Sequence, residues 1–172
     1  MSDMNIVRGL DIAQYASALG GNAAAETIVK QKRTRLYKYV HPADDSMATD
    51  ATAETFFENV EFAGQVRNCY AWAKTTITGH ASNHFTATLK SKVAADATAK
   101  ATLGTYTSDT DVTAQGTLTA GIRKAFDISA CTDLVVQAGS GLTLTIAKGG
   151  AGVIVKAGTT FVVEVEEDGG GA

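Results

Sequence analysis

The stretch Phe85-Thr86-Ala87-Thr88-Leu89-Lys90-Ser91-Lys92-Val93 decides the fold class of this chain. Side chains of an extended strand alternate between two faces, which places Phe85, Ala87, Leu89 and Val93 on one face. The opposite face carries Thr86, Thr88, Lys90 and Lys92. This pattern predicts a strand with one apolar and one polar side. Such strands are typical of antiparallel sheets that pack one face on a core and leave the other in water.

The same period of two recurs toward the C-terminus, in Leu142-Thr143-Leu144-Thr145-Ile146 and in Phe161-Val162-Val163-Glu164-Val165-Glu166. Glycine-containing turns such as Gly139-Ser140-Gly141 separate these segments at hairpin spacing. About ten strand candidates without an amphipathic helix between them predict an all-β fold, an antiparallel β-sandwich of jelly-roll type or a barrel. The candidates are residues 54–63, 68–78, 83–94, 101–108, 112–119, 122–128, 133–138, 141–147, 152–156 and 159–166.

Before residue 50 the sequence has a different character. Residues 9–21 predict a short helix, with Asp11 as its N-cap and Gly20 just past its C-terminus. Its apolar side chains share one face, and a helix this short needs a partner surface to be stable in water. Residues 43–50 are polar and acidic and are typical of a linker. We therefore expect an N-terminal arm over residues 1–50, a β-sandwich over 51–167 and a flexible tail over 168–172.

The arm contains cations interleaved with aromatic residues between positions 30 and 39. A nucleic-acid interface would use such cations for phosphates and the tyrosines for stacking, but the net charge of −3 argues against it. We favour a strand or arm that docks on an acidic surface of a protein partner, or on the body of its own fold. The candidate interface residues are Ile12, Tyr15, Leu19, Lys30, Lys32, Arg33, Arg35, Tyr37, Lys38 and Tyr39.

Residues with catalytic or metal-binding potential are few, and each has a simpler interpretation. His80 and His84 have the spacing of a helical metal pair but lie in a turn rich in Gly, Ser and Asn. Asp109-Thr110-Asp111 is similar to half of a calcium loop that lacks its glycine and its distal glutamate. The sequence has no Gly-x-Ser-x-Gly motif, and its glycine-rich turns lie between strands rather than before a helix. We therefore expect no enzyme, no metal and no cofactor.

The two cysteines and the hydrophobic pattern bear on the compartment of the protein. Cys69 and Cys131 fit no zinc or redox spacing, and two buried thiols are favoured over a disulfide. The N-terminus lacks the pattern of a signal peptide, and no apolar run is long enough to span a membrane. These features favour a protein that is assembled in a cytoplasm and has no membrane partner.

The body of the chain, about residues 54–166, resembles the capsid decoration (cement) proteins of tailed bacteriophages, which are β-sandwiches, often jelly rolls. The resemblance rests on the threonine-faced strands 85–93 and 142–146, the glycine-punctuated hairpins 139–158, the low charge and the mixed segment before residue 50. It implies a structural virion protein on the capsid surface, assembled in the host cytoplasm. Its partners would be the major capsid protein, bound across several subunits, and further copies of itself in a trimer or dimer.

Two other classes stay open at this point. One is another phage structural component, such as a head–tail connector, a tail protein or a fibre-base protein. The other is a carbohydrate-binding β-sandwich, which would need exposed aromatic platforms. The only dense aromatic groups are Phe56-Phe57 and the pair Tyr70 and Trp72, and we interpret that pair, which shares a strand face, as part of the core.

Overall fold

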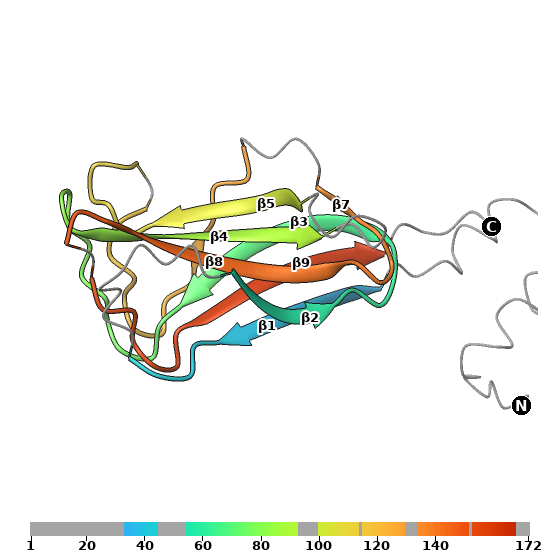
Figure 1. The fold of residues 1–172 in the computed structure, drawn as a ribbon, viewed down its shortest axis with the longest axis horizontal. Helices are drawn as coiled ribbons and strands as arrows, with labels where there is room; N and C mark the ends of the chain where they lie inside the picture. The colour runs from blue at the N-terminus through green and yellow to red at the C-terminus, as the bar shows by residue number, and fades with distance from the viewer. Residues whose placement is uncertain are drawn as a thin grey trace, which may run out of the picture. The chain divides into compact units, whose positions relative to one another are not determined.

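Two antiparallel β-sheets pack face to face in the computed structural model of the chain (Figure 1). The structure describes residues 33–44, 54–92, 100–113, 115–129, 134–151 and 153–167. Sheet I has the strand order β1 (Thr34–Val40), β9 (Thr160–Glu167), β3 (Gly64–Trp72) and β6 (Lys124–Ala125), and β7 (Val135–Val136) also pairs with β3. Sheet II has the order β2 (Glu54–Asn59), β8 (Gly141–Gly149), β4 (His84–Lys92) and β5 (Lys100–Thr107). The predicted all-β antiparallel sandwich is confirmed.

The strand pairing is nested, as in one long hairpin that has been rolled up. Strand β4 pairs with β5, β3 with β6 and β7, β2 with β8, and β1 with β9, and every pair is antiparallel. The additional pairs β3–β9 and β4–β8 join these hairpin layers into the two sheets. Strands that are distant in sequence therefore lie side by side, as the neighbouring blue β1 and red β9 show in Figure 1.

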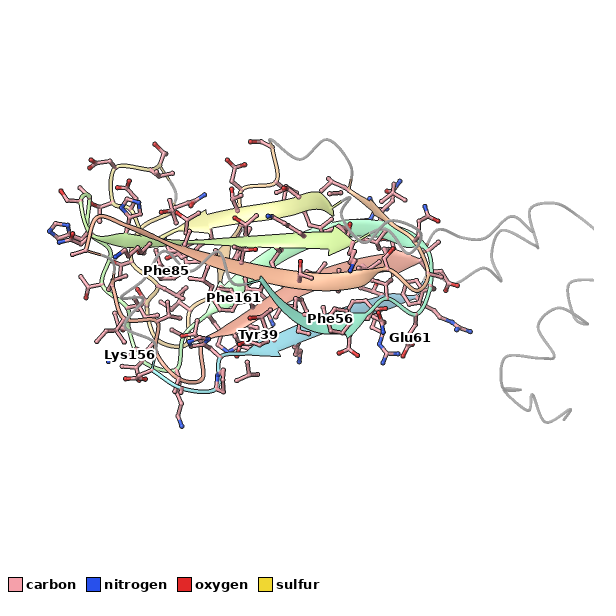
Figure 2. All side chains as sticks on the ribbon, in the orientation of Figure 1. Tyr39, Phe56, Glu61, Phe85, Lys156 and Phe161 are labelled. Carbon is pink, nitrogen blue, oxygen red and sulfur yellow. The ribbon has the colours of Figure 1, made fainter. Side chains whose placement is uncertain are left out.

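The predicted alternation of apolar and polar side chains from Phe85 to Leu89 is confirmed. Phe85, Ala87 and Leu89 have no exposed surface and belong to the core between the sheets, whereas Thr86 and Thr88 are partly exposed. Strand β9 contributes Phe161, Val163 and Val165 to the same core from sheet I. Figure 2 shows Phe85 and Phe161 inside the sandwich. Removing these apolar side chains from water is the main favourable term in folding.

Two of the predicted strands are absent from the described residues. Residues 112–119 form a turn and a single bridge between Ile77 and Leu118, because Gly116 adopts a φ of 91° that interrupts an extended chain. Residues 153–156 likewise form no strand. The β-favouring residues Thr and Val in the first segment and Val and Ile in the second predicted these strands.

The sandwich begins earlier than the predicted boundary at residue 50. Strand β1 pairs with β9 along its whole length, from Thr34 opposite Glu166 to Val40 opposite Thr160. The compact unit accordingly runs from Thr34 to Asp168. The cations of this segment obscured a strand whose alternate positions, Tyr37 and Tyr39, pack toward the core.

The chain that leaves β1 is fastened to the turn before β9. The backbone N–H of His41 donates to the carbonyl oxygen of Thr159, and that of Gly158 donates to the carbonyl oxygen of His41, both at 2.8 Å. Asp44 accepts a hydrogen bond from the backbone N–H of Ala157 (2.8 Å) and pairs with Lys156 (3.0 Å). The backbone N–H of Ala157 and the Lys156 ammonium lower the pKa of Asp44. Residues 41–44 are thus part of the sandwich rather than of a linker.

Several predictions concern residues outside the described ranges. They are the helix over residues 9–21, the tail over 168–172 and the environment of Cys131. Cys69 is a buried thiol whose Sγ lies 3.7 Å from the carbonyl oxygen of Leu103. Within the described part of the chain, no helix has the length and apolar character needed to cross a membrane.

Candidate functional site

The outer face of sheet I carries exposed apolar side chains on its edge strand. In β1 the alternate residues Tyr37 and Tyr39 pack toward the core, so Leu36, Lys38 and Val40 lie on the opposite face. The exposed fractions of Leu36 and Val40 are 42% and 56%. Exposed apolar side chains that gather on one face can mark a surface that binds another molecule.

An aromatic pair continues this surface on β3. Cys69 and Ala71 belong to the core, so the alternation places Tyr70 and Trp72 on the outer face of sheet I. The two rings stack with their centroids 5.9 Å apart. The Arg123 guanidinium carbon lies 4.8 Å from the Tyr70 ring centroid, within the range of a cation–π interaction. Tyr70 is buried (3% exposed), as the sequence predicted, although it lies outside the cluster between the two sheets, and Trp72 is partly exposed.

Strand register places the two groups in neighbouring rows. Lys38 is opposite Val162 and Val162 is opposite Tyr70, so one row crosses three strands. In the next row Val40 is opposite Thr160 and Thr160 is opposite Trp72. We define the outer patch of sheet I as Leu36, Lys38, Val40, Tyr70, Trp72 and Arg123. Val162, Thr160 and Tyr70 are buried (0%, 5% and 3% exposed), so the accessible members are Leu36, Lys38, Val40, Arg123 and the partly exposed Trp72. Their mixture of apolar, aromatic and cationic side chains is typical of surfaces that bind other proteins.

Some of the predicted interface residues lie outside the described part of the chain, and the two predicted tyrosines pack in or against the core. Ile12, Tyr15, Leu19, Lys30 and Lys32 lie outside the described residues. Tyr37 is 1% exposed, and its hydroxyl oxygen accepts a hydrogen bond from the backbone N–H of Glu61 (3.0 Å). The Tyr39 ring packs against the rings of Phe57 and Phe161, with centroids 5.9 and 6.4 Å away. Neither tyrosine is therefore placed to stack on a nucleic-acid base.

The predicted cations that fall within the described residues lie at the surface. Arg33 and Lys38 are exposed, and the Arg35 guanidinium pairs with the Glu61 carboxylate at the end of the sandwich where Figure 2 labels Glu61. Sequence reasoning missed Leu36, Val40 and Arg123. The alternation of Thr34–Val40 could have revealed the first two, whereas the position of Arg123 depends on contacts between distant segments.

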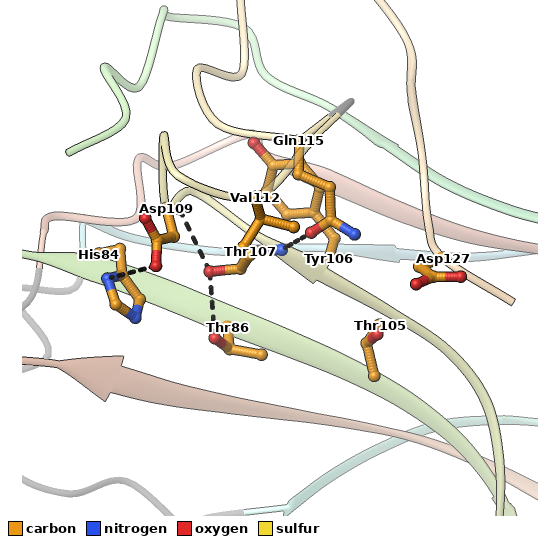
Figure 3. A pocket seen from close by; sticks show the side chains of 9 residues that line it. All are labelled: His84, Thr86, Thr105, Tyr106, Thr107, Asp109, Val112, Gln115 and Asp127. Atoms are coloured by element: carbon orange, nitrogen blue, oxygen red, sulfur yellow. Dashed lines mark hydrogen bonds and ion pairs between the residues drawn. The ribbon is translucent and has the colours of Figure 1, made fainter. Parts of the chain in front are cut away.

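A second candidate site is a polar cavity of about 300 Å³ on the outer face of sheet II, between β4, β5 and the turn that follows β5 (Figure 3). Threonines of β4 and β5 form one side of it, and the Thr86 and Thr107 hydroxyl oxygens lie 3.2 Å apart. The lining residues are His84, Thr86, Thr105, Tyr106, Thr107, Asp109, Val112, Gln115 and Asp127.

Local hydrogen bonds fix the two carboxylates of this cavity. Asp127 Oδ1 accepts hydrogen bonds from the backbone N–H (2.8 Å) and the hydroxyl (2.6 Å) of Ser129. The Ser129 hydroxyl, together with the backbone N–H, lowers the pKa of Asp127. Asp109 Oδ1 accepts a hydrogen bond from the backbone N–H of Asp111 (2.9 Å), and Asp109 Oδ2 lies 3.7 Å from Nδ1 of His84. The segment 109–111 is thus the simple aspartate turn that we favoured over half of a calcium loop.

Hydrogen bonds to β5 fix the turn that covers the cavity. The buried Tyr106 hydroxyl donates to the carbonyl oxygen of Gly116, and burial raises the pKa of Tyr106. The Gln115 side-chain oxygen accepts a hydrogen bond from the backbone N–H of Thr107. The backbone N–H of Asp109 also donates to Thr107 Oγ1 (3.2 Å). Together these hydrogen bonds hold Gln115 and Asp109 above the β5 surface.

His80, the first residue of the predicted histidine pair, stabilises a turn. Nδ1 of His80 accepts hydrogen bonds from the backbone N–H groups of Ser82 (3.0 Å) and Asn83 (3.1 Å), which shapes the turn before β4. His84 faces Asp109 in the cavity instead. Among the described residues, no group of three or more His, Cys, Asp or Glu side chains is arranged to hold a metal ion.

Comparisons with known proteins place this chain in no family. No family model matches it, and no curated protein does. Among solved structures, a chain in the structure of infectious bursal disease virus, Gx strain, is similar at 15% sequence identity and a TM-score of 0.34. The match covers 81% of this chain and 33% of the other, so the present chain spans about a third of the length of that protein.

Proposed function

We propose that this chain is a structural virion protein of jelly-roll type that decorates and stabilises a bacteriophage capsid by binding across subunits of the major capsid protein. The nested strand order supports the jelly-roll assignment, since β1-β9-β3-β6 over β2-β8-β4-β5 is one hairpin rolled into two sheets. Double-sheet jelly rolls recur in viral capsid and lectin domains. That is an analogy at the level of the fold, so the functional argument depends on the surface.

The outer patch of sheet I is the observation that carries the proposal. Trp and Arg are among the residue types that most often dominate the binding energy of protein interfaces, and the patch contains Trp72 and Arg123, both in contact with the buried Tyr70. The stacked pair and the Arg123 cation are held in place by the sheet, so little side-chain entropy is lost on binding. Leu36 and Val40 add exposed apolar surface whose burial favours association.

The position of the patch also suits a two-part contact with a shell. Strand β1 follows directly on residue 33, so the preceding segment is linked covalently to the strand that carries Leu36 and Val40. A surface patch and a tethered segment that bind the same shell together gain affinity through effective concentration. In this proposal the protein is not an enzyme, needs no cofactor, and acts as a dimer or trimer on the virion surface.

The proposal is tested by co-sedimentation of the purified full-length protein with empty shells of the major capsid protein from the same virus. Saturable co-sedimentation is expected. Trp72→Ala should weaken it by roughly 30-fold or more, since truncation of a central aromatic residue costs about 2 kcal/mol or more in binding. The matched control is Thr88→Ala on the outer face of sheet II, which should bind as the wild type does. Protein that stays in solution with saturating shells would contradict the proposal.

A deletion that tests the arm must end before strand β1. A deletion of residues 1–45 would remove β1 and leave the edge of β9 unpaired, so a loss of binding could simply reflect damage to the sandwich. A deletion of residues 1–33 keeps the compact unit that begins at Thr34. We expect this shorter deletion to remain folded and to bind shells more weakly than the full chain. Equal binding would rule out the arm while leaving the patch in place.

Other phage components are separated from a decoration protein by position alone. A head–tail connector, a tail protein or a fibre-base protein would use the same kind of apolar patch against a different partner. Images of assembled particles would show density on the shell lattice for a decoration protein and at the tail or the neck for the others.

A further inference from the structure

We propose that the cavity on the outer face of sheet II is a binding site for a neutral polyhydroxylated ligand, the size of one saccharide unit. The cavity volume of about 300 Å³ is at the lower end of the usual range for small-molecule sites. The proposal is independent of the capsid proposal, because it concerns the opposite face of the sandwich and different residues.

The hydrogen-bonding groups of the cavity match the hydroxyl groups of a sugar. Both hydrogen bonds that Asp127 accepts within the described residues end on Oδ1, so Oδ2 can accept from a ligand hydroxyl. In Asp109 the backbone hydrogen bond also ends on Oδ1, and Oδ2 lies 3.7 Å from Nδ1 of His84 at the edge of the cavity. The Thr107 hydroxyl is engaged with Thr86, Asp109 and the Phe85 carbonyl oxygen, so Thr105 on β5 is the threonine whose hydroxyl can donate to or accept from a ligand.

Gln115 supplies an oriented donor. Its side-chain oxygen is engaged by the Thr107 backbone N–H, which leaves the amide nitrogen as the end that can donate. Figure 3 shows this nitrogen on the side of Gln115 where Asp127 lies. A donor and a carboxylate acceptor that line the same cavity can engage hydroxyl groups of one ligand, and both are in place before binding.

The same inventory disfavours other ligand classes. Of the nine described residues that line the cavity, His84 alone can become a cation, whereas Asp109 and Asp127 add negative charge, which disfavours phosphate and other anions. The Lys124 ammonium lies nearby but is directed at the Gln115 carbonyl oxygen, 3.4 Å away. Divalent cations would need more converging oxygen ligands than two separately fixed carboxylates provide. Val112, 40% exposed, gives an apolar wall against which the C–H face of a sugar ring can pack.

The proposal is tested by titrating the full-length protein with free glucose, galactose, mannose and N-acetylglucosamine, followed by NMR amide shifts. At least one sugar should produce saturable shifts at Thr105, Thr107 and Gln115, with a dissociation constant in the millimolar range that a small ligand allows. Asp127→Asn and Asp109→Asn keep an oxygen for the turn and replace the other acceptor with a donor. Each should weaken binding by roughly 10-fold, as expected when one hydrogen bond to the ligand is lost.

The matched control is Asp111→Asn, which alters the charge of the same turn without touching the cavity. It should bind the sugar as the wild type does. Three results would overturn the proposal: no saturable shift with any sugar up to concentrations on the order of 100 mM, equal binding by the two cavity variants, or the same shifts with calcium chloride alone. The amide spectra report whether each variant is folded, so a misfolded variant would not be mistaken for a negative result.

Discussion

The outer faces of the two sheets differ, although both are built on strands with the same alternation. The outer face of sheet I presents Leu36, Val40 and the partly exposed Trp72, which stacks on the buried Tyr70. The outer face of sheet II presents partly exposed threonines around a polar cavity. A period of two thus fixes which residues face the core but leaves the chemistry of the outer face open. One sandwich can therefore offer an apolar surface to a protein and a hydroxyl-rich surface to a small ligand.

The largest expected effect is a loss of folding stability after damage to the core, which supports both outer faces. Phe85 has no exposed surface, and its ring centroid lies 5.7 Å from that of Tyr106. Phe85→Ala should lower the free energy of unfolding by about 3–5 kcal/mol, through lost burial and a residual cavity. Urea unfolding measures the change. The exposed Phe56→Ala is the control, and a similar loss there would show that the core is wrongly placed.

A second change should affect sheet I more than sheet II. A Cβ added to Gly64 would collide with the backbone carbonyl oxygen of Glu166 on the neighbouring strand β9. Gly64→Ala should therefore lower the free energy of unfolding by roughly 1–3 kcal/mol and distort the pairing of β3 with β9. Shell binding should suffer more than sugar binding. The exposed neighbour Gln65→Ala should leave stability nearly unchanged, and equal losses for both variants would refute the clash.

The cation of the outer patch offers a smaller and more selective test. Arg123 is exposed, and its guanidinium lies over the Tyr70 ring. Arg123→Ala should reduce the free energy of unfolding by only about 0.5–1 kcal/mol, the value of an exposed cation–π contact. Shell binding should weaken less than with Trp72→Ala, while sugar binding stays the same. A loss of sugar binding would show that the two outer faces are not independent.

The smallest effect concerns acid stability at the Asp44 fastening. Contacts with Ala157 and Lys156 lower the pKa of this carboxyl below its unfolded value of 3.8. Its stabilising contribution is therefore fully present above that pH and is lost as pH falls through the lower, folded value. Asp44→Asn should remove this part of the acid dependence. Thermal melts at neutral and at acidic pH measure it, and an unchanged pH profile would mean that the contacts do not persist in solution.

Sequence reasoning recovered the elements whose alternation is undisturbed by charge. Strand β4 and strand β9 were predicted within one or two residues at each end, because Phe85 and Phe161 begin regular apolar patterns. Strand β1 was assigned to an arm, since its cations obscured the core-facing Tyr37. The segment 112–119 was predicted as a strand from Thr and Val content, whereas Gly116 turns the chain there.

The candidate sites were harder to predict than the strands, because their residues converge only in the fold. Arg123 reaches Tyr70 across more than fifty positions of sequence. Asp127 reaches the cavity through a bridge between its own backbone and that of Thr105. Local patterns predict which face a side chain occupies, and only the strand order tells which segments meet there.

The most direct test of the central claim is an image of the protein on its shell by electron cryo-microscopy, with shells from the same virus. We predict density on the shell lattice, with the outer face of sheet I against the major capsid protein and the cavity of sheet II toward solvent. Trp72 would then lie in the contact. Density with sheet II against the shell, or protein found only at the tail or neck, would contradict the account.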